Sequence, residues 1–155
     1  MAVVLRKEIG DNGSTRVIFG EIRREYPSFF GDAMQHKDCA MFVQTLLHSA
    51  TIAHQLHLSS KSYSEHKALQ KYYENIEGIV DALVESYQGK YGLIESYPTN
   101  YHNSGNKSAL AYMESLQKFV GEARGSLPQD SELQNEIDNI VNLINSTVYK
   151  LKFLR

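Results

Sequence analysis

Apolar residues recur every three or four positions in four separate stretches of this chain, and this period limits its fold more than any other feature. The stretches cover about residues 38–57, 63–88, 107–124 and 131–155. Such spacing places apolar side chains along one face of an α-helix. Helices of this kind can bury their apolar faces only by packing against one another. The sequence therefore predicts an all-α fold, a four-helix bundle.

Each predicted helix has an apolar stripe that we expect to be buried. In chain order the stripes are Val43, Leu46, Ala50 and Ala53; Leu69, Tyr73, Ile76, Val80, Leu83 and Tyr87; Ala109, Met113, Leu116 and Val120; and Leu133, Ile137, Ile140, Ile144, Leu151 and Leu154. Ser62 stands before the second helix, and Glu65 follows three residues later. This is the pattern of a capping box, which favours a helix start at that point.

The breaks between the helices differ in length, and the difference predicts the topology. Residues 58–61 and 125–130 are short, so each joins two antiparallel helices into a hairpin. Residues 90–105 contain a proline and two glycines. About 15 residues at roughly 3.3 Å each can run the length of a bundle. We therefore expect two antiparallel hairpins joined by one long connection, the topology of ferritin-like bundles.

The chain before the bundle shows a weaker pattern. We expect residues 1–37 to be an N-terminal extension and residues 38–155 to form the bundle. Residues 17–26 have the composition of a short helix, which Pro27 is expected to end. Residues 27–31 then favour a loop.

The single cysteine and the lack of a membrane-spanning run favour a protein of the cytoplasm. The chain has 155 residues, a formal net charge of -2 and one cysteine, so an internal disulfide is excluded. No apolar run approaches the roughly 20 residues that span a bilayer. We expect no membrane partner and, because the net charge is slightly negative, no nucleic-acid partner. Motifs of nucleotide-binding, zinc-protease and serine-hydrolase sites do not occur, so we assign no catalytic residue and no organic cofactor.

Three histidines lie near the turn between the first two helices. His54 and His57 are three residues apart on one face of the first helix, and His66 opens the second. A short turn brings these positions together, so the three imidazoles are expected to converge. Imidazole is a ligand for iron, zinc and copper. These residues are candidate metal ligands.

Two carboxylates on the second helix are the matching oxygen donors. Asp81 and Glu85 are four residues apart and share an edge of the helix with His66. Fifteen residues separate His66 from Asp81, about 22 Å along a helix. One chain therefore cannot use both at one ion. A two-fold dimer can, because it brings the carboxylates of one subunit to the histidines of the other.

This hairpin resembles that of the starvation-induced mini-ferritins (Dps). The resemblance rests on His54 and His66, twelve residues apart, and on Asp81 and Glu85 at the following offsets; a shorter loop would place His57 where His54 stands. The third ligand position holds Gln70. The resemblance implies iron, or alternatively zinc, bound between subunits, with a ferroxidase-like oxidation of Fe(II).

From residue 40 onward the chain also resembles small uncharacterised proteins of tailed phages. The shared stretches include His57-Leu58, residues 66–69, Tyr72-Tyr73 and residues 147–154. This likeness implies a location in the host cytoplasm. It favours an alternative function, in which the protein is a non-catalytic helical structural or interaction protein that keeps the bundle without the metal chemistry. Gln70 favours this alternative, because an amide oxygen balances none of a metal ion's charge.

Overall fold

The computed structural model describes residues 6–9, 15–18, 28–99, 101–105 and 107–154, with the backbone alone before residue 36. The chain divides into two compact units, residues 1–34 and residues 35–155. The division expected from the sequence, after residue 37, stays a prediction.

In the first unit, two strands pair antiparallel. Strand β1 covers Arg6–Ile9 and β2 covers Thr15–Ile18, with Arg6 opposite Ile18 and Ile9 opposite Thr15. The predicted short helix at 17–26 is therefore wrong at Val17 and Ile18, where β-branched side chains favour a strand. The remainder of that segment, residues 19–27, lies outside the described residues.

Four α-helices follow, as the apolar period predicts. They are α2 (Ser28–Ser59), α3 (Tyr63–Tyr91), α4 (Ala109–Ala123) and α5 (Ser131–Phe153), and a 3₁₀ turn, η1 (Arg124–Ser126), follows α4. Among the described residues, none of these helices combines the length and the apolar character that a membrane span requires.

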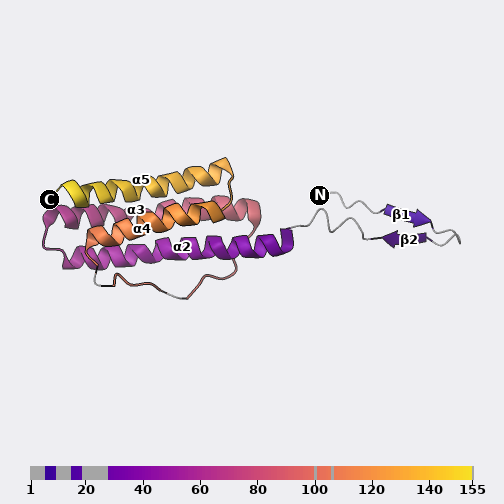
Figure 1. Cartoon of the computed structure of the whole chain (residues 1–155), viewed down its shortest axis with the longest axis horizontal. Coiled ribbons are helices and arrows are strands. Elements are labelled where there is room, and N and C mark those ends of the chain that lie inside the picture. The colour runs from indigo at the N-terminus through magenta and orange to yellow at the C-terminus, as the bar shows by residue number, and fades with distance from the viewer. Residues whose placement is uncertain (1–5, 10–14, 19–27, 100, 106, 155) are drawn as a thin grey trace. The chain divides into compact units, whose positions relative to one another are not determined.

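The helices are connected as two antiparallel hairpins (Figure 1). A short turn joins α2 to α3, and the 3₁₀ turn lies between α4 and α5. The segment between α3 and α4 returns along the whole bundle beside α2, so α3 and α4 run in the same direction (Figure 1). This is the predicted topology with one long connection, which we call the crossover (residues 92–108).

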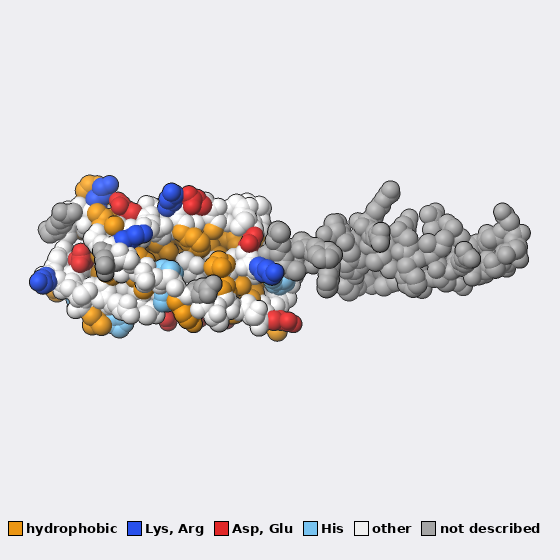
Figure 2. Space-filling model, turned by 60° about the horizontal axis from the view of Figure 1, so that its bottom comes forward, with side chains coloured by type: hydrophobic (Ala, Val, Ile, Leu, Met, Phe, Trp, Pro, Cys, Tyr) orange, Lys and Arg blue, Asp and Glu red, His pale blue; other side chains and the backbone are white. Residues whose placement is uncertain are grey.

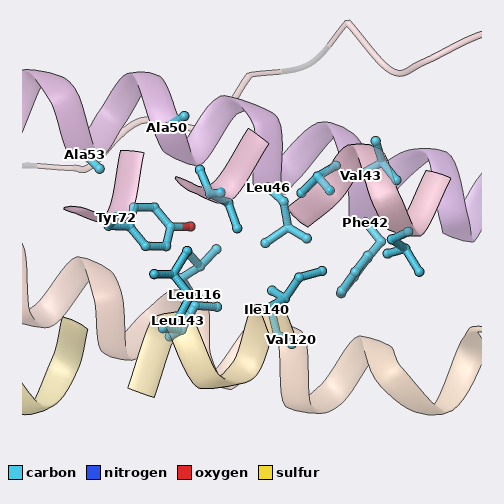
Figure 3. Packing of buried hydrophobic residues seen from close by; sticks show 14 of the residues in the cluster. Phe42, Val43, Leu46, Ala50, Ala53, Tyr72, Leu116, Val120, Ile140 and Leu143 are labelled. Carbon is cyan, nitrogen blue, oxygen red and sulfur yellow. The ribbon is translucent and has the colours of Figure 1, made fainter. Parts of the chain in front are cut away.

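The core lies along the inner faces of the four helices (Figure 3). Leu46, Ile76, Met113 and Ile140 are fully buried, one from each helix. Figure 3 shows side chains of α2 such as Leu46 facing Leu116 and Ile140 across the centre of the bundle. The predicted stripes are confirmed at nearly every position, because helical period directly determines which residues share a face.

Three local predictions need correction. Residues 28–31 were expected to form a loop, but α2 already begins at Ser28. A proline is as compatible with the entry of a helix as with its end, so the sequence around position 27 does not by itself predict a loop after it. Leu154 is 47% exposed because α5 ends at Phe153, and Tyr73 is only half-buried.

Candidate functional site

The turn between α2 and α3 is short because both helix ends are capped locally. The hydroxyl of Ser62 accepts a hydrogen bond from the backbone N–H of Glu65, as the capping pattern predicts. The backbone N–H of Ser60 donates to the carbonyl of His57 in the last turn of α2. The last turn of α2 and the first turn of α3 therefore lie side by side.

His57 and His66 form a reciprocal pair across this turn. The Nδ1 of His57 donates to the backbone carbonyl of His66 at 2.8 Å, and the Nδ1 of His66 donates to the carbonyl of His57 at 3.1 Å. The two rings stack with centroids 3.5 Å apart. Carbonyls at a helix end lack partners within the helix, so the His66 ring caps the end of α2.

His54 lies beside this pair and is exposed to solvent. Its ring stacks on Tyr73 with centroids 4.3 Å apart and lies 5.7 Å from the ring of His57. Tyr73 also meets His57 edge-on at 5.2 Å. The three histidines predicted from sequence are thus neighbours in a row, His54 beside His57 and His57 beside His66, and Tyr73, which was expected in the core, contacts the first two.

The hydrogen bonds decide which ring nitrogens are available. A carbonyl only accepts, so Nδ1 of His57 and Nδ1 of His66 both carry protons. In the neutral rings, Nε2 then holds the free lone pair. Metal-bound histidines usually donate their other ring N–H to a carbonyl or carboxylate in this way, which fixes the tautomer. Both rings therefore have the tautomer of a ligand that binds through Nε2.

Gln70 already has partners along the edge of α3. Its amide oxygen accepts from Nζ of Lys67 at 2.8 Å, and its amide nitrogen donates to Glu74 at 2.7 Å. Residue 70 follows His66 by one turn, so it lies on the same edge, as expected. These exposed hydrogen bonds, from Lys67 to Gln70 and from Gln70 to Glu74, give the residue 70 side chain a role that needs no metal ion.

Asp81 and Glu85 are exposed on α3 and lie farther along the helix. Within the described residues, no three His, Cys, Asp or Glu side chains are grouped closely enough to hold a metal ion. The structure of one chain thus brings the nitrogen donors together but leaves the oxygen donors about 22 Å away along α3.

A second histidine cluster joins the crossover to the bundle, and sequence analysis missed it. Nε2 of His48 on α2 donates to the backbone carbonyl of His102 at 2.5 Å. Nε2 of His102 pairs with the hydroxyl of Tyr112 on α4 at 2.9 Å, and the Tyr101 ring lies 4.8 Å from His48. Burial lowers the pKa of His102, and nearby His48 and Lys107 lower it further.

Polar contacts also tie α3 to α5 at the other end of the bundle. Asp130 precedes α5 and accepts hydrogen bonds from Lys90, at 2.5 Å, and from the hydroxyl of Tyr91. The hydrogen bond from Lys90 holds the pKa of Asp130 below its usual range. Because this carboxylate faces α3, it forms no side-chain cap on α5. These contacts hold the end of α3 against the start of α5.

Other polar side chains offer little for chemistry. Cys39 is buried, as expected, and burial raises its pKa to about 12, so its thiol is unreactive. Tyr72 is buried and hydrogen-bonded to Ser49 at 2.6 Å. A hollow of about 260 Å³ lies between α3, α4 and α5, and its lining, which includes Ser62, Ser108 and Lys150, contains no histidine.

Comparison with known proteins places the chain in one family. The model of a family of unknown function, DUF5856, matches residues 57–151. The match covers more than half of the chain, which therefore belongs to this family. It begins at His57 and includes His66, Asp81 and Glu85, and His54 falls outside it. No curated protein and no solved structure matches.

Proposed function

We propose that this member of the DUF5856 family binds a transition metal, iron or alternatively zinc, between two copies of itself. His66 and either His54 or His57 supply the nitrogen donors of one subunit. Asp81 and Glu85 of the second subunit supply the oxygen donors. An iron ion held there would be the substrate of a ferroxidase-like reaction, in which Fe(II) loses one electron to an oxidant such as oxygen or peroxide.

One observation carries this proposal. The Nδ1 atoms of His57 and His66 are both held by backbone carbonyls, which orients the rings and leaves Nε2 as the donor. The donor types also fit, because imidazole nitrogen and carboxylate oxygen together suit iron and zinc.

The exposed edge of α3 supports the need for a second copy. Asp81 and Glu85 face solvent and have no ion pair among the described salt bridges. A two-fold axis beside α3 would run the two helices antiparallel, so the carboxylates of each would approach the histidines of the other. The dimer would then hold two identical sites.

A non-catalytic structural role is the second candidate, and the same hydrogen bonds favour it. The reciprocal pair gives two Nδ1 atoms and two carbonyls hydrogen-bond partners without any ligand, and it fastens α2 to α3. In this role the protein is a helical structural or interaction protein. Gln70 favours this role, because its amide is already engaged by Lys67 and Glu74.

A subunit-mixing experiment separates the two roles. One variant is His66→Ala, and the other is the double variant Asp81→Asn, Glu85→Gln. Each alone should lose metal, because every site in its dimer is broken. A mixture refolded together should regain one intact site per mixed dimer, measured as zinc or iron bound per chain after dialysis.

The control and the contradicting outcome are specific. Glu114→Gln removes an exposed carboxylate on α4, away from the predicted interface, and should leave metal binding unchanged. A wild-type protein that binds no metal, or that binds it as a monomer in light scattering, contradicts the shared site. The structural role would then stand, because it requires only that His66→Ala loosen the α2–α3 turn.

A further inference from the structure

One end of the bundle exposes an unusual number of apolar side chains. At this end α2 finishes, α3 begins and α5 finishes (Figure 1). Five of the nine exposed large hydrophobic residues among the described side chains belong to these turns: Leu58, Tyr63, Tyr149, Phe153 and Leu154. Single exposed apolar residues are ordinary, but a concentration of them marks a surface that contacts something. We call this surface the turn end.

The turn end is also basic. Among the described residues of these turns it carries Lys61, Lys67, Lys150 and Lys152, together with the carboxylate of Glu65. Figure 2 shows basic side chains in blue next to apolar ones in orange at the left-hand end of the bundle, with a few acidic side chains in red nearby. Nζ of Lys152 lies 5.7 Å from the ring centroid of Phe153. Partial burial lowers the pKa of Lys150, and the charge of nearby Lys71 lowers it further.

We propose that the turn end docks on the surface of a lipid bilayer with anionic headgroups. Leu58, Phe153 and Leu154 would enter the boundary between headgroups and acyl chains, while the lysines stay level with the phosphates. Apolar side chains surrounded by lysine are the combination that holds proteins at such a surface. It departs from the expectation of no membrane partner, which took into account only the net charge and the lack of a spanning segment, and it does not depend on the metal site.

The distribution of charge favours this orientation. The other end of the bundle carries Asp130 and Glu132 beside Lys90, and Glu95 lies just beyond α3. An anionic surface therefore attracts the turn end and gains nothing from the opposite one. The net charge of -2 conceals this asymmetry, because it sums both ends.

Two other occupants fit less well. A second copy docked by a two-fold axis would set the same lysines against one another, at an electrostatic cost. A nucleic-acid strand is bound by a basic groove with stacked aromatic rings. The turn end does carry the aromatic rings of Tyr63, Tyr149 and Phe153. The aliphatic side chains of Leu58 and Leu154, however, add nothing to stacking, whereas they suit an acyl boundary.

Vesicle flotation of the full chain tests the proposal. The protein should float with vesicles of equal parts phosphatidylglycerol and phosphatidylcholine, and it should stay behind with phosphatidylcholine alone. Raising the salt concentration should weaken the binding, because salt screens the lysines. No flotation with the anionic vesicles would overturn the proposal.

Variants locate the contact. Leu58→Ser and Phe153→Ser should each reduce partition about three- to tenfold, through lost apolar burial. The double variant Lys150→Glu, Lys152→Glu should abolish it. Leu93→Ser is the matched control, because Leu93 is 76% exposed, close to the 71% of Leu58, but lies beyond α3 at the opposite end. Its partition should equal that of the wild type.

Two results would overturn the assignment. One is an equal loss in Leu93→Ser, which would mean that exposed apolar surface anywhere suffices. The other is tight binding of a single-stranded oligonucleotide that the lysine variant loses and Leu58→Ser keeps, with no flotation difference between Leu58→Ser and wild type. That pattern would assign the turn end to nucleic acid. Circular dichroism confirms that each variant keeps its helices.

Discussion

Two pairs of histidines hold backbone carbonyls in this bundle, and they do so over very different distances along the chain. His57 and His66 are nine residues apart and bond to each other's carbonyl across one tight turn. His48 and His102 are 54 residues apart, and only one bond joins them. The first pair fastens two neighbouring helices, whereas the second fastens the crossover to α2. The same side chain thus serves a local contact in one place and a long-range contact in the other.

The two pairs also differ in how deeply their rings are buried and in what the rings contact. His57 is 7% exposed, and its ring contacts His66 and Tyr73. His48 is half-buried and contacts mainly the crossover. We therefore expect the pair at the turn to be part of the cooperative core and the pair at the crossover to open more easily.

The largest expected effects lie in the core beneath each pair. Leu69 lies one helical turn after His66 on α3, and Met113 is the next residue after Tyr112 on α4. Both side chains are fully buried. Leu69→Ala and Met113→Ala should each lower the free energy of unfolding by about 2–5 kcal/mol, through lost contacts and a cavity. Urea denaturation measures both. A loss below about 1 kcal/mol at either would show that its region does not share the core.

Replacing one histidine of each pair with alanine should destabilise the two regions to different extents. His57→Ala should cost about 1–3 kcal/mol, because it removes a buried ring and leaves a carbonyl without that donor. His48→Ala should cost less. Hydrogen exchange locates the effect: His57→Ala should speed exchange in the first turns of α3, and His48→Ala should speed it in residues 101–105. Equal acceleration of both segments by either variant would contradict the distinction.

The two helix starts next to these pairs offer a smaller, matched comparison. Ser62 caps α3 after the turn, and Ser108 caps α4 at the end of the crossover. Ser62→Ala and Ser108→Ala should each cost about 1 kcal/mol in thermal or urea unfolding. Ser131→Ala is the control, because Ser131 is the first residue of α5 and not its N-cap, which is Asp130. A change there as large as in the cap variants would mean that capping is not the cause.

The smallest effect is a pH dependence of the crossover. Burial gives His102 a folded-state pKa below its unfolded value, and the groups facing it are His48 on α2, Tyr112 on α4 and Lys107 on the crossover. Between the two pKa values the unfolded chain binds more protons, so stability is full above the ordinary histidine range and falls as pH drops through it. His102→Gln should flatten this slope. A slope unchanged by that substitution would assign the proton to another group.

Sequence alone determined the helical framework and part of the candidate site. Buried positions such as Val80, Met113 and Ile144 follow from helical period, which is a local property of the chain. The cap at Ser62 and the gathering of His54, His57 and His66 follow from a short turn, which is local as well. The metal itself and the dimer stay predictions, because they depend on a second chain.

The tertiary structure decided everything that depends on the path of the chain between helices. Only the crossover lying beside α2 brings His102 to His48, and no period in the sequence encodes that contact. The proton positions on His57 and His66 depend on which carbonyls the fold presents to each ring. The basic turn end arises in the same way. Lys61 and Lys152 are far apart in sequence, and they share one end because α5 returns antiparallel to α3.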